Sequence, residues 1–110
     1  MILTKDWIVA CSADEVNEGG AHSVTVAGRR ICIVRHEDRL YALSDLCSHG
    51  QAYLSEGYCD TTDCVLECPL HGGLVDFRTG KAMSAPIEKD APVFATKVED
   101  GMVLIEIEAA

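Results

Sequence analysis

The feature that most constrains this chain is a pair of short Cys/His motifs near the middle of the sequence. Cys47-Ser48-His49 is followed, after residues 50–67, by Cys68-Pro69-Leu70-His71. Glycine comes directly after both motifs, at Gly50 and Gly72. Because glycine permits tight loops and close approach of backbone N–H groups, each motif is predicted to form a ligand-binding loop. The fold must then bring two distant loops together around one centre.

Three interpretations of these motifs remain open at this point. They are ordinary core cysteines and surface histidines, or a structural zinc site with two Cys and two His ligands, or a [2Fe-2S] cluster in which two histidines replace two cysteines on one iron. Zinc sites commonly take a pair of cysteines from one loop and a pair of histidines from another. Here each loop carries one of each, which favours a binuclear cluster held from two sides.

Length, charge and cysteine content exclude several classes of protein. The chain has 110 residues, which predicts one domain, and no apolar run approaches the length of a membrane span. Its N-terminus lacks the pattern of a secretory signal, so we expect a cytoplasmic protein whose six cysteines serve metal binding rather than disulfides. The net charge of −9 argues against nucleic acid. The acids either keep the chain soluble or steer it toward a basic partner.

Short apolar runs separated by turns predict an all-β fold, a sandwich or a small barrel. Within 29–36, Ile31 and Ile33 are predicted to share one face of a strand, and Cys32 and Val34 the other. Ser12 and Glu15 indicate one capped helical turn. The expected strands and hairpins cover 6–11, 22–28 and 29–36 with a turn at Gly28-Arg29, 40–45, the two sides of the turn at 60–63, 73–77, and a hairpin over 91–108 that turns at Asp100-Gly101.

The two motifs, read as CSHG (47–50) and CPLHGG (68–73), resemble the cluster-binding loops of the Rieske family. Residues 54–57, 76–80 and Pro86 support the resemblance. The whole chain is similar in size to the small Rieske ferredoxins of bacterial systems that dioxygenate aromatic rings. The resemblance implies one [2Fe-2S] cluster per chain, with the inner iron on Cys47 and Cys68 and the outer iron, near the surface, on His49 and His71.

The same resemblance implies the architecture and the function. It implies a Rieske-type β-sandwich or barrel base from about 1–44 and 87–110, with a smaller inserted β subdomain at about 45–86 that carries the cluster loops. The protein would be a monomeric one-electron carrier that takes electrons from a flavin-containing reductase and delivers them to a terminal Rieske oxygenase, without contacting membranes or nucleic acid and without being an enzyme itself. The alternatives are a Rieske-like small subunit of a nitrite reductase and a zinc-stabilised binding module without a redox role.

The resemblance also predicts a low reduction potential. Rieske proteins of high potential carry one further cysteine in each loop, at positions that match Ala52 and Leu70 here, and two hydroxyl donors, at positions that match Gly73 and Val75. Because those donors are missing, we expect a potential near the lower end of the Rieske range, roughly −150 mV.

The remaining reactive and aromatic residues receive structural interpretations. Cys11 and Cys32 are predicted in the core, Cys59 and Cys64 as free thiols beside a turn, His22 and His36 on the surface, and Trp7 and Phe94 as core anchors. A largely uncharged tip, formed by residues 50–53 and 70–74, is predicted to meet the redox partner. The expected acids near this tip are Asp45, Glu56 and Glu88.

Overall fold

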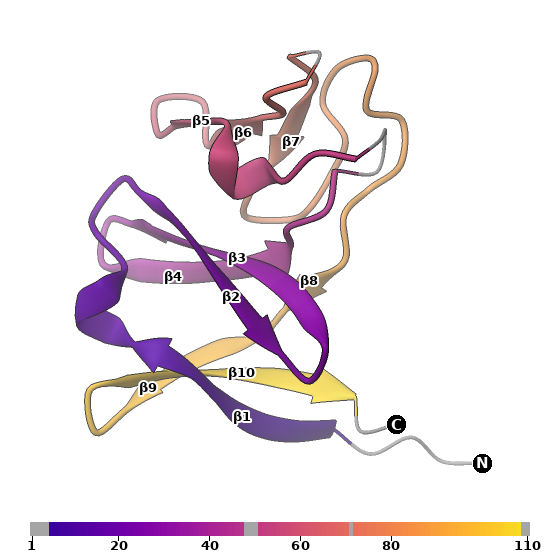
Figure 1. Cartoon of the computed structure of the whole chain (residues 1–110). Helices are drawn as coiled ribbons and strands as arrows, with labels where there is room; N and C mark the ends of the chain where they lie inside the picture. The colour runs from indigo at the N-terminus through magenta and orange to yellow at the C-terminus, as the bar shows by residue number, and fades with distance from the viewer. Residues whose placement is uncertain (1–4, 48–50, 71, 109–110) are drawn as a thin grey trace.

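β-Strands dominate the computed structural model of the chain, which describes residues 5–47, 51–70 and 72–108 (Figure 1). In chain order the elements are β1 (Lys5–Ser12), the 3-10 turn η1 (Ala13–Glu15), β2 (Ala21–Val26), β3 (Arg29–His36), β4 (Arg39–Ser44), the 3-10 turn η2 (Leu54–Glu56), β5 (Tyr58–Asp60), β6 (Val65–Glu67), β7 (Leu74–Asp76), β8 (Val93–Phe94), β9 (Thr96–Glu99) and β10 (Met102–Glu108). They form three antiparallel sheets with the strand orders β1-β10-β9, β2-β3-β4-β8 and β5-β6-β7. The expected all-β fold is confirmed.

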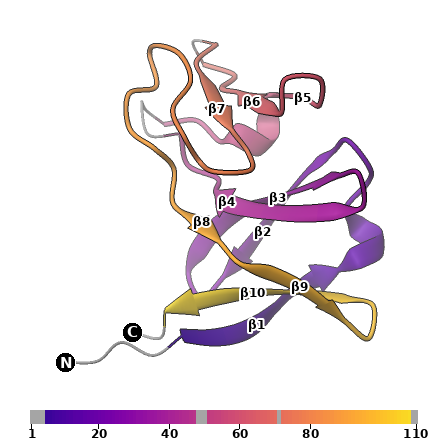
Figure 2. The same cartoon turned by 180° about the vertical axis from the view of Figure 1, so that it is seen from behind.

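The sheet that contains β3 lies between the other two sheets, as Figures 1 and 2 show from opposite sides. Successive side chains of a strand point to opposite faces. Ile31 and Ile33 belong to a buried cluster that includes Ile105 of β10. Cys32 and Val34 belong to a second buried cluster, which includes Phe77. The predicted division of β3 into two faces is therefore confirmed, and both faces are buried.

Tight turns connect the hairpins of the two larger sheets. β9 and β10 turn at Asp100-Gly101, as predicted, with φ angles of 52° and 76°. β2 and β3 turn at Ala27-Gly28, with the same two values, rather than at Gly28-Arg29. Two successive positive φ angles define the type I′ turn that matches the twist of paired strands.

The expected single hairpin over 91–108 is right for β9 and β10 but wrong for the residues before them. Val93 and Phe94 form β8, which pairs with Leu43 and Ala42 of β4 in the middle sheet. The chain then changes sheets at Ala95, whose carbonyl accepts a hydrogen bond from the backbone N–H of Glu106 at 3.0 Å. A strand of two residues has no alternating pattern of its own, so the sequence does not indicate that β8 pairs with β4.

Trp7 is not the core anchor that its size predicted. It lies opposite Glu106 in the β1-β10 register, on the outer face of the sheet, and is 38% exposed. The neighbouring position, Ile8, faces inward opposite Ile105. The amino group of Lys97 lies 4.4 Å from the centre of the Trp7 ring, a cation–π contact that covers part of it. Phe94 is partly buried against the core of the base, so it is closer than Trp7 to the core anchor that was predicted.

Helices are limited to short turns. Ser12 donates its backbone N–H to the Glu15 carboxylate at 3.2 Å, in agreement with the predicted cap of η1. Among residues 5–47, 51–70 and 72–108, none of the helical segments has the length and apolar character needed to cross a lipid bilayer.

Candidate metal centre

The two cysteines of the Cys/His motifs occupy equivalent positions in two loops of the same design. The backbone N–H of Cys47 donates to the carbonyl of Ala52 at 2.8 Å, and that of Cys68 donates to the carbonyl of Gly73, also at 2.8 Å. A β-bridge between Leu46 and Tyr53 closes the first loop. Pairing of Glu67 in β6 with Leu74 in β7 closes the second loop. Each cysteine is thus fixed at the base of a narrow, hydrogen-bonded loop.

The fold brings the two loops together. Cys47 and Cys68 are each 2% exposed and belong to the same buried hydrophobic cluster as Leu54 and Ile87. The described residues of the segment after β4 and of the β6–β7 connection, which include both cysteines, lie at the same end of the molecule in Figures 1 and 2. The other two predicted ligands, His49 and His71, lie outside the described residues.

The surroundings of the two cysteines fit a sulfur-bound metal cluster. A buried thiolate is costly unless a cation compensates its charge, and thiolates are the ligands that iron–sulfur clusters require. The second loop also has a glycine where no side chain fits: a Cβ at Gly73 would lie 2.7 Å from Cγ1 of Ile87 and 3.1 Å from the Ile87 backbone nitrogen. The backbone of this loop therefore packs directly against Ile87, which leaves no room for a side chain at Gly73.

A buried carboxylate supports the first loop. Asp45 is 0% exposed. Its side chain accepts hydrogen bonds from Arg30 Nε, from the Ser55 backbone N–H and from the Ser55 hydroxyl, each at 2.7 Å. Its carbonyl accepts the backbone N–H of Leu54 at 2.7 Å. Asp45 therefore joins β3, the first loop and η2, and the expectation that it is a surface acid beside a docking site is wrong.

Arg30 extends this support to the surface of the first loop. Its guanidinium carbon lies 3.7 Å from the centre of the Tyr53 ring, and Nη2 lies 3.6 Å from a carboxylate oxygen of Glu56. Stacking on an aromatic face and pairing with a carboxylate are both typical of a planar guanidinium. No sequence motif pointed to Arg30, because its role depends on strand register.

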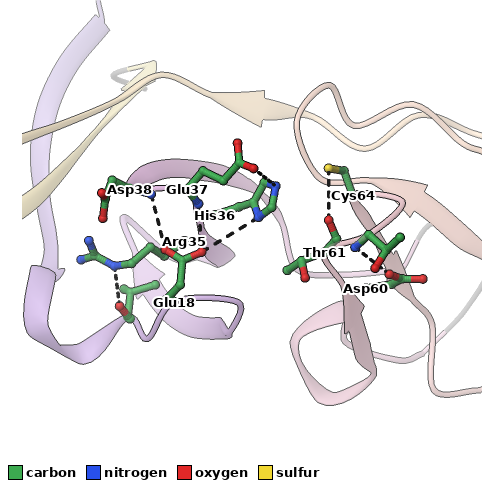
Figure 3. Close-up of polar contacts among 10 residues, drawn as sticks. Glu18, Arg35, His36, Glu37, Asp38, Asp60, Thr61 and Cys64 are labelled. Carbon is green, nitrogen blue, oxygen red and sulfur yellow. Dashed lines mark hydrogen bonds and ion pairs between the residues drawn. The ribbon is translucent and has the colours of Figure 1, made fainter.

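The four remaining cysteines follow the sequence prediction. Cys11 and Cys32 are buried in the two cores. Cys59 and Cys64 are free thiols, and the Cys64 Sγ lies 3.7 Å from the carbonyl oxygen of Thr61 (Figure 3). Burial, and then the nearby Asp60, raise the pKa of the Cys59 thiol, which favours its protonated form.

His36 was predicted to lie on the surface, but its side chain is mostly buried. Its side chain is 17% exposed and its ring meets that of Phe77 edge to face, with 5.8 Å between centroids. Figure 3 shows it beside the Glu18 carboxylate, which accepts the backbone N–H groups of Glu37 and Asp38 at 2.9 and 3.4 Å. His36 therefore belongs to a structural contact around the β3–β4 turn. His22 is partly exposed, near Glu15.

Exposed apolar side chains gather around the two loops. Leu46, Tyr53 and Leu70 are 53%, 36% and 51% exposed. A shallow groove of about 300 Å³ lies between the loops, lined by Gln51, Ala52, Tyr53, Glu56, Pro69 and Leu70. Two members of the predicted tip are buried: Ala52 contributes only to the wall of this groove, and Gly73 lies beneath the surface.

Known proteins resemble the chain over nearly its whole length. The Rieske [2Fe-2S] domain family matches residues 6–95. The ferredoxin component of the naphthalene 1,2-dioxygenase/salicylate 5-hydroxylase systems of Ralstonia sp is 37% identical over 106 residues, which are 96% of this chain and 100% of that protein. The ferredoxin of carbazole 1,9a-dioxygenase from Nocardioides aromaticivorans has a similar structure, with a TM-score of 0.86 and 31% identity over 90% of this chain and 95% of that one.

Two further likenesses bear on partners and on the alternative assignment. A ferredoxin solved in a complex of reduced oxygenase and oxidized ferredoxin in carbazole 1,9a-dioxygenase has a TM-score of 0.82 and 36% identity, over 90% of this chain and 91% of that one. Two structures described as putative nitrite reductase small subunits, one of them from Mycobacterium tuberculosis, have TM-scores of 0.76 and 0.81 but are only 21% and 18% identical, over 94% and 97% of this chain and 98% and 99% of their own. At these identities, the two nitrite reductase structures show a shared fold only.

Removing the Asp45 carboxylate tests its role beneath the first loop. We expect Asp45→Ala to lower the free energy of unfolding by about 3 kcal/mol, because it leaves Arg30 and two Ser55 donors without their buried acceptor. Asp63→Ala, the same change at an exposed acid of the β5–β6 turn, should stay within about 0.5 kcal/mol. Equal losses for the two variants, measured by chemical denaturation, would contradict this role.

A double-mutant cycle tests the close approach at Gly73. Gly73→Ser should destabilise the protein by about 1–3 kcal/mol, because its Cβ overlaps Ile87. In an Ile87→Ala background the same change should cost less than half as much, since Cγ1 of Ile87 is gone. Identical costs in both backgrounds would show that Ile87 is not the obstacle.

Proposed function

The chain belongs to the Rieske [2Fe-2S] domain family, and on that premise we propose that Cys47, His49, Cys68 and His71 hold one [2Fe-2S] cluster. One observation carries this proposal. The Cys47 and Cys68 loops are closed by equivalent backbone hydrogen bonds, and both cysteines lie in the same hydrophobic core. The two histidines are assigned by their places in the motifs. When bound, such a cluster takes up and releases one electron.

The protein is an electron carrier of the ferredoxin type found in aromatic dioxygenase systems, and it is not the oxygenase. The likeness extends over 96% of this chain and 100% of the Ralstonia ferredoxin component, so this chain spans the full length of that carrier. Its own residues bind the cofactor, exclude water from the two cysteines and present an apolar contact surface.

The partners follow from the same assignment. We propose a terminal Rieske oxygenase as electron acceptor, which the oxygenase complex of the 36% identical ferredoxin supports. We propose a flavin-containing reductase as donor, and a monomeric carrier in the cytoplasm. We also propose that residues 45–86 form the cluster-binding subdomain and that 1–44 and 87–110 form its base.

The contact surface for the partner lies at the cluster-loop end. Tyr53 and Leu70 are exposed there and line the groove between the loops, and Leu46 is exposed next to its bridge partner Tyr53. A small apolar contact suits a carrier that must dissociate after each transfer, and electron-transfer interfaces commonly bury less than about 1,200 Å². Because Asp45 is buried, Glu56 and Glu88 remain as the exposed acids of the predicted set. The net charge of −9 then acts at long range.

Replacing single cysteines distinguishes the iron–sulfur cluster from the zinc alternative. Cys47→Ser and Cys68→Ser should each lose at least about nine-tenths of the iron and sulfide, because a serine oxygen is a poor substitute for a soft thiolate. Cys59→Ser, a change at a cysteine outside the loops, should keep both. Purified protein should be red-brown and bleach with dithionite. Colourless protein that contains zinc instead of iron would exclude the carrier function.

The reduction potential should lie near the bottom of the Rieske range, at roughly −150 mV. Val75 is buried and Gly73 has no side chain, so neither supplies a hydroxyl toward the cofactor. Hydroxyl donors to cluster sulfurs raise the potential because they stabilise the more negative reduced form. Protein-film voltammetry that gives a clearly positive value would contradict this prediction.

Truncation of one exposed leucine tests the proposed contact surface. Leu70→Ala should raise the Kd for the oxidised acceptor about fivefold, equivalent to about 1 kcal/mol. Val98→Ala is the matched control: Val98 is also 51% exposed but lies on β9, in the sheet at the opposite end of the molecule (Figure 1). Equal effects of the two changes would place the contact elsewhere.

The salt dependence of electron transfer distinguishes long-range electrostatic steering from direct contact with the partner. Raising the ionic strength from about 0.02 to 0.5 M shortens the Debye length from roughly 20 to 4 Å and should slow second-order electron transfer. Leu70→Ala should keep the same salt dependence. A rate that stays constant across this range would assign the acids to solubility alone.

A further inference from the structure

A second group of metal-binding side chains lies outside the Cys/His loops. The Cys11 sulfur, a Glu15 carboxylate oxygen and a His22 imidazole nitrogen all lie within 4.8 Å of one another. Glu15 Oε2 and His22 Nε2 are 4.0 Å apart. Cys11 is near the end of β1, Glu15 ends η1 and His22 is near the start of β2. In Figures 1 and 2 this connection lies on the other side of the molecule from the segment that follows β4.

Local structure places the three residues beside one another. The register between β1 and β10 shifts between Val9 and Cys11, a β-bulge that changes where the following side chain points. Glu15 is fixed by the hydrogen bond that its carboxylate accepts from the Ser12 backbone N–H. His22 is held in β2 by its pairing with Ile33 of β3. Little rearrangement is then needed before these donors act together.

The donor set matches a borderline-soft divalent cation. One sulfur, one nitrogen and one oxygen ligand are the combination that Zn²⁺ accepts, whereas Ca²⁺ and Mg²⁺ prefer oxygen ligands throughout. Zinc bonds of about 2.0–2.3 Å place tetrahedral ligands roughly 3.5 Å apart. The Glu15–His22 distance of 4.0 Å is already close to that value. The side chains of Glu15 and His22 are 55% and 36% exposed, so an ion can reach the site from solvent. A water molecule can then serve as the fourth ligand.

Charge favours a dication here. A thiolate and a carboxylate together balance the two positive charges of a divalent ion.

We propose that Cys11, Glu15 and His22 bind one zinc ion at the junction of the β1-β10-β9 and β2-β3-β4-β8 sheets. The ion joins the end of β1 to the start of β2 and so fastens the two sheets of the base to each other. The site is separate from the iron–sulfur cluster and requires no electron transfer.

Zinc titration of the iron-loaded protein tests this site. ZnCl₂ added to untagged holoprotein in a non-chelating buffer should bind at one ion per chain, as measured by calorimetry, while the iron content stays constant. Glu15→Gln and His22→Gln should each raise the Kd at least tenfold. His36→Gln, a change at a histidine that also neighbours glutamates, is the matched control and should leave the Kd unchanged.

Cadmium gives a readout specific to the sulfur ligand. Cd²⁺ bound to the wild-type holoprotein should produce a near-ultraviolet thiolate-to-metal absorption band, and Cys11→Ser should abolish it. Zinc should also raise the Tm of the wild type but not that of Glu15→Gln. Absence of saturable zinc binding, or equal affinity in the wild type, Glu15→Gln and His22→Gln, would overturn the proposal. Because all these variants keep the iron–sulfur loops, this outcome leaves the carrier function untouched.

Discussion

Burial of both faces of β3 is the constraint on which the rest of the structure depends. Ile31 and Ile33 pack toward β10, while Cys32 and Val34 pack toward the side that carries Leu66 and Phe77, and all four β3 side chains are 0% exposed. One strand therefore serves two hydrophobic cores. A chain of 110 residues thereby packs its middle sheet against the β1-β10-β9 sheet on one face and supports the loops on the other.

Hydrogen bonds between polar groups connect this sheet to the first cofactor loop. Arg30 of β3 reaches the buried Asp45, and Asp45 in turn holds Ser55 and the backbone of Leu54 beyond the first loop. The second loop depends instead on close packing of Gly73 against Ile87. Both devices fix the backbone around a cysteine, which suits a carrier because rigid ligands keep the geometry similar in its two redox states. The apolar side chains outside the loops remain available for a partner.

The sequence predicted most of the strands and the two faces of β3, because both depend on local spacing, whereas the chemistry of the motifs was implied by their resemblance to a family. It failed where long-range packing decides the outcome. Trp7 faces outward because its neighbour Ile8 takes the inner position. Asp45 is buried because β3 supplies Arg30 and η2 supplies Ser55. Cys11, Glu15 and His22 lie close together next to a β-bulge of β1, an arrangement that no spacing rule reveals. The ligand assignment of His49 and His71 still rests on the motif and the family.

Nitrogen coupling to the reduced cluster tests the central claim most directly. Protein labelled with ¹⁵N-histidine and reduced with dithionite should show two histidine nitrogens coupled to the electron spin in electron–nuclear double resonance. A His22→Gln, His36→Gln variant should keep both couplings, since neither residue lies in the loops. Absence of histidine coupling, or its loss in that variant, would contradict ligation by His49 and His71 and with it the account of this protein as a Rieske-type carrier.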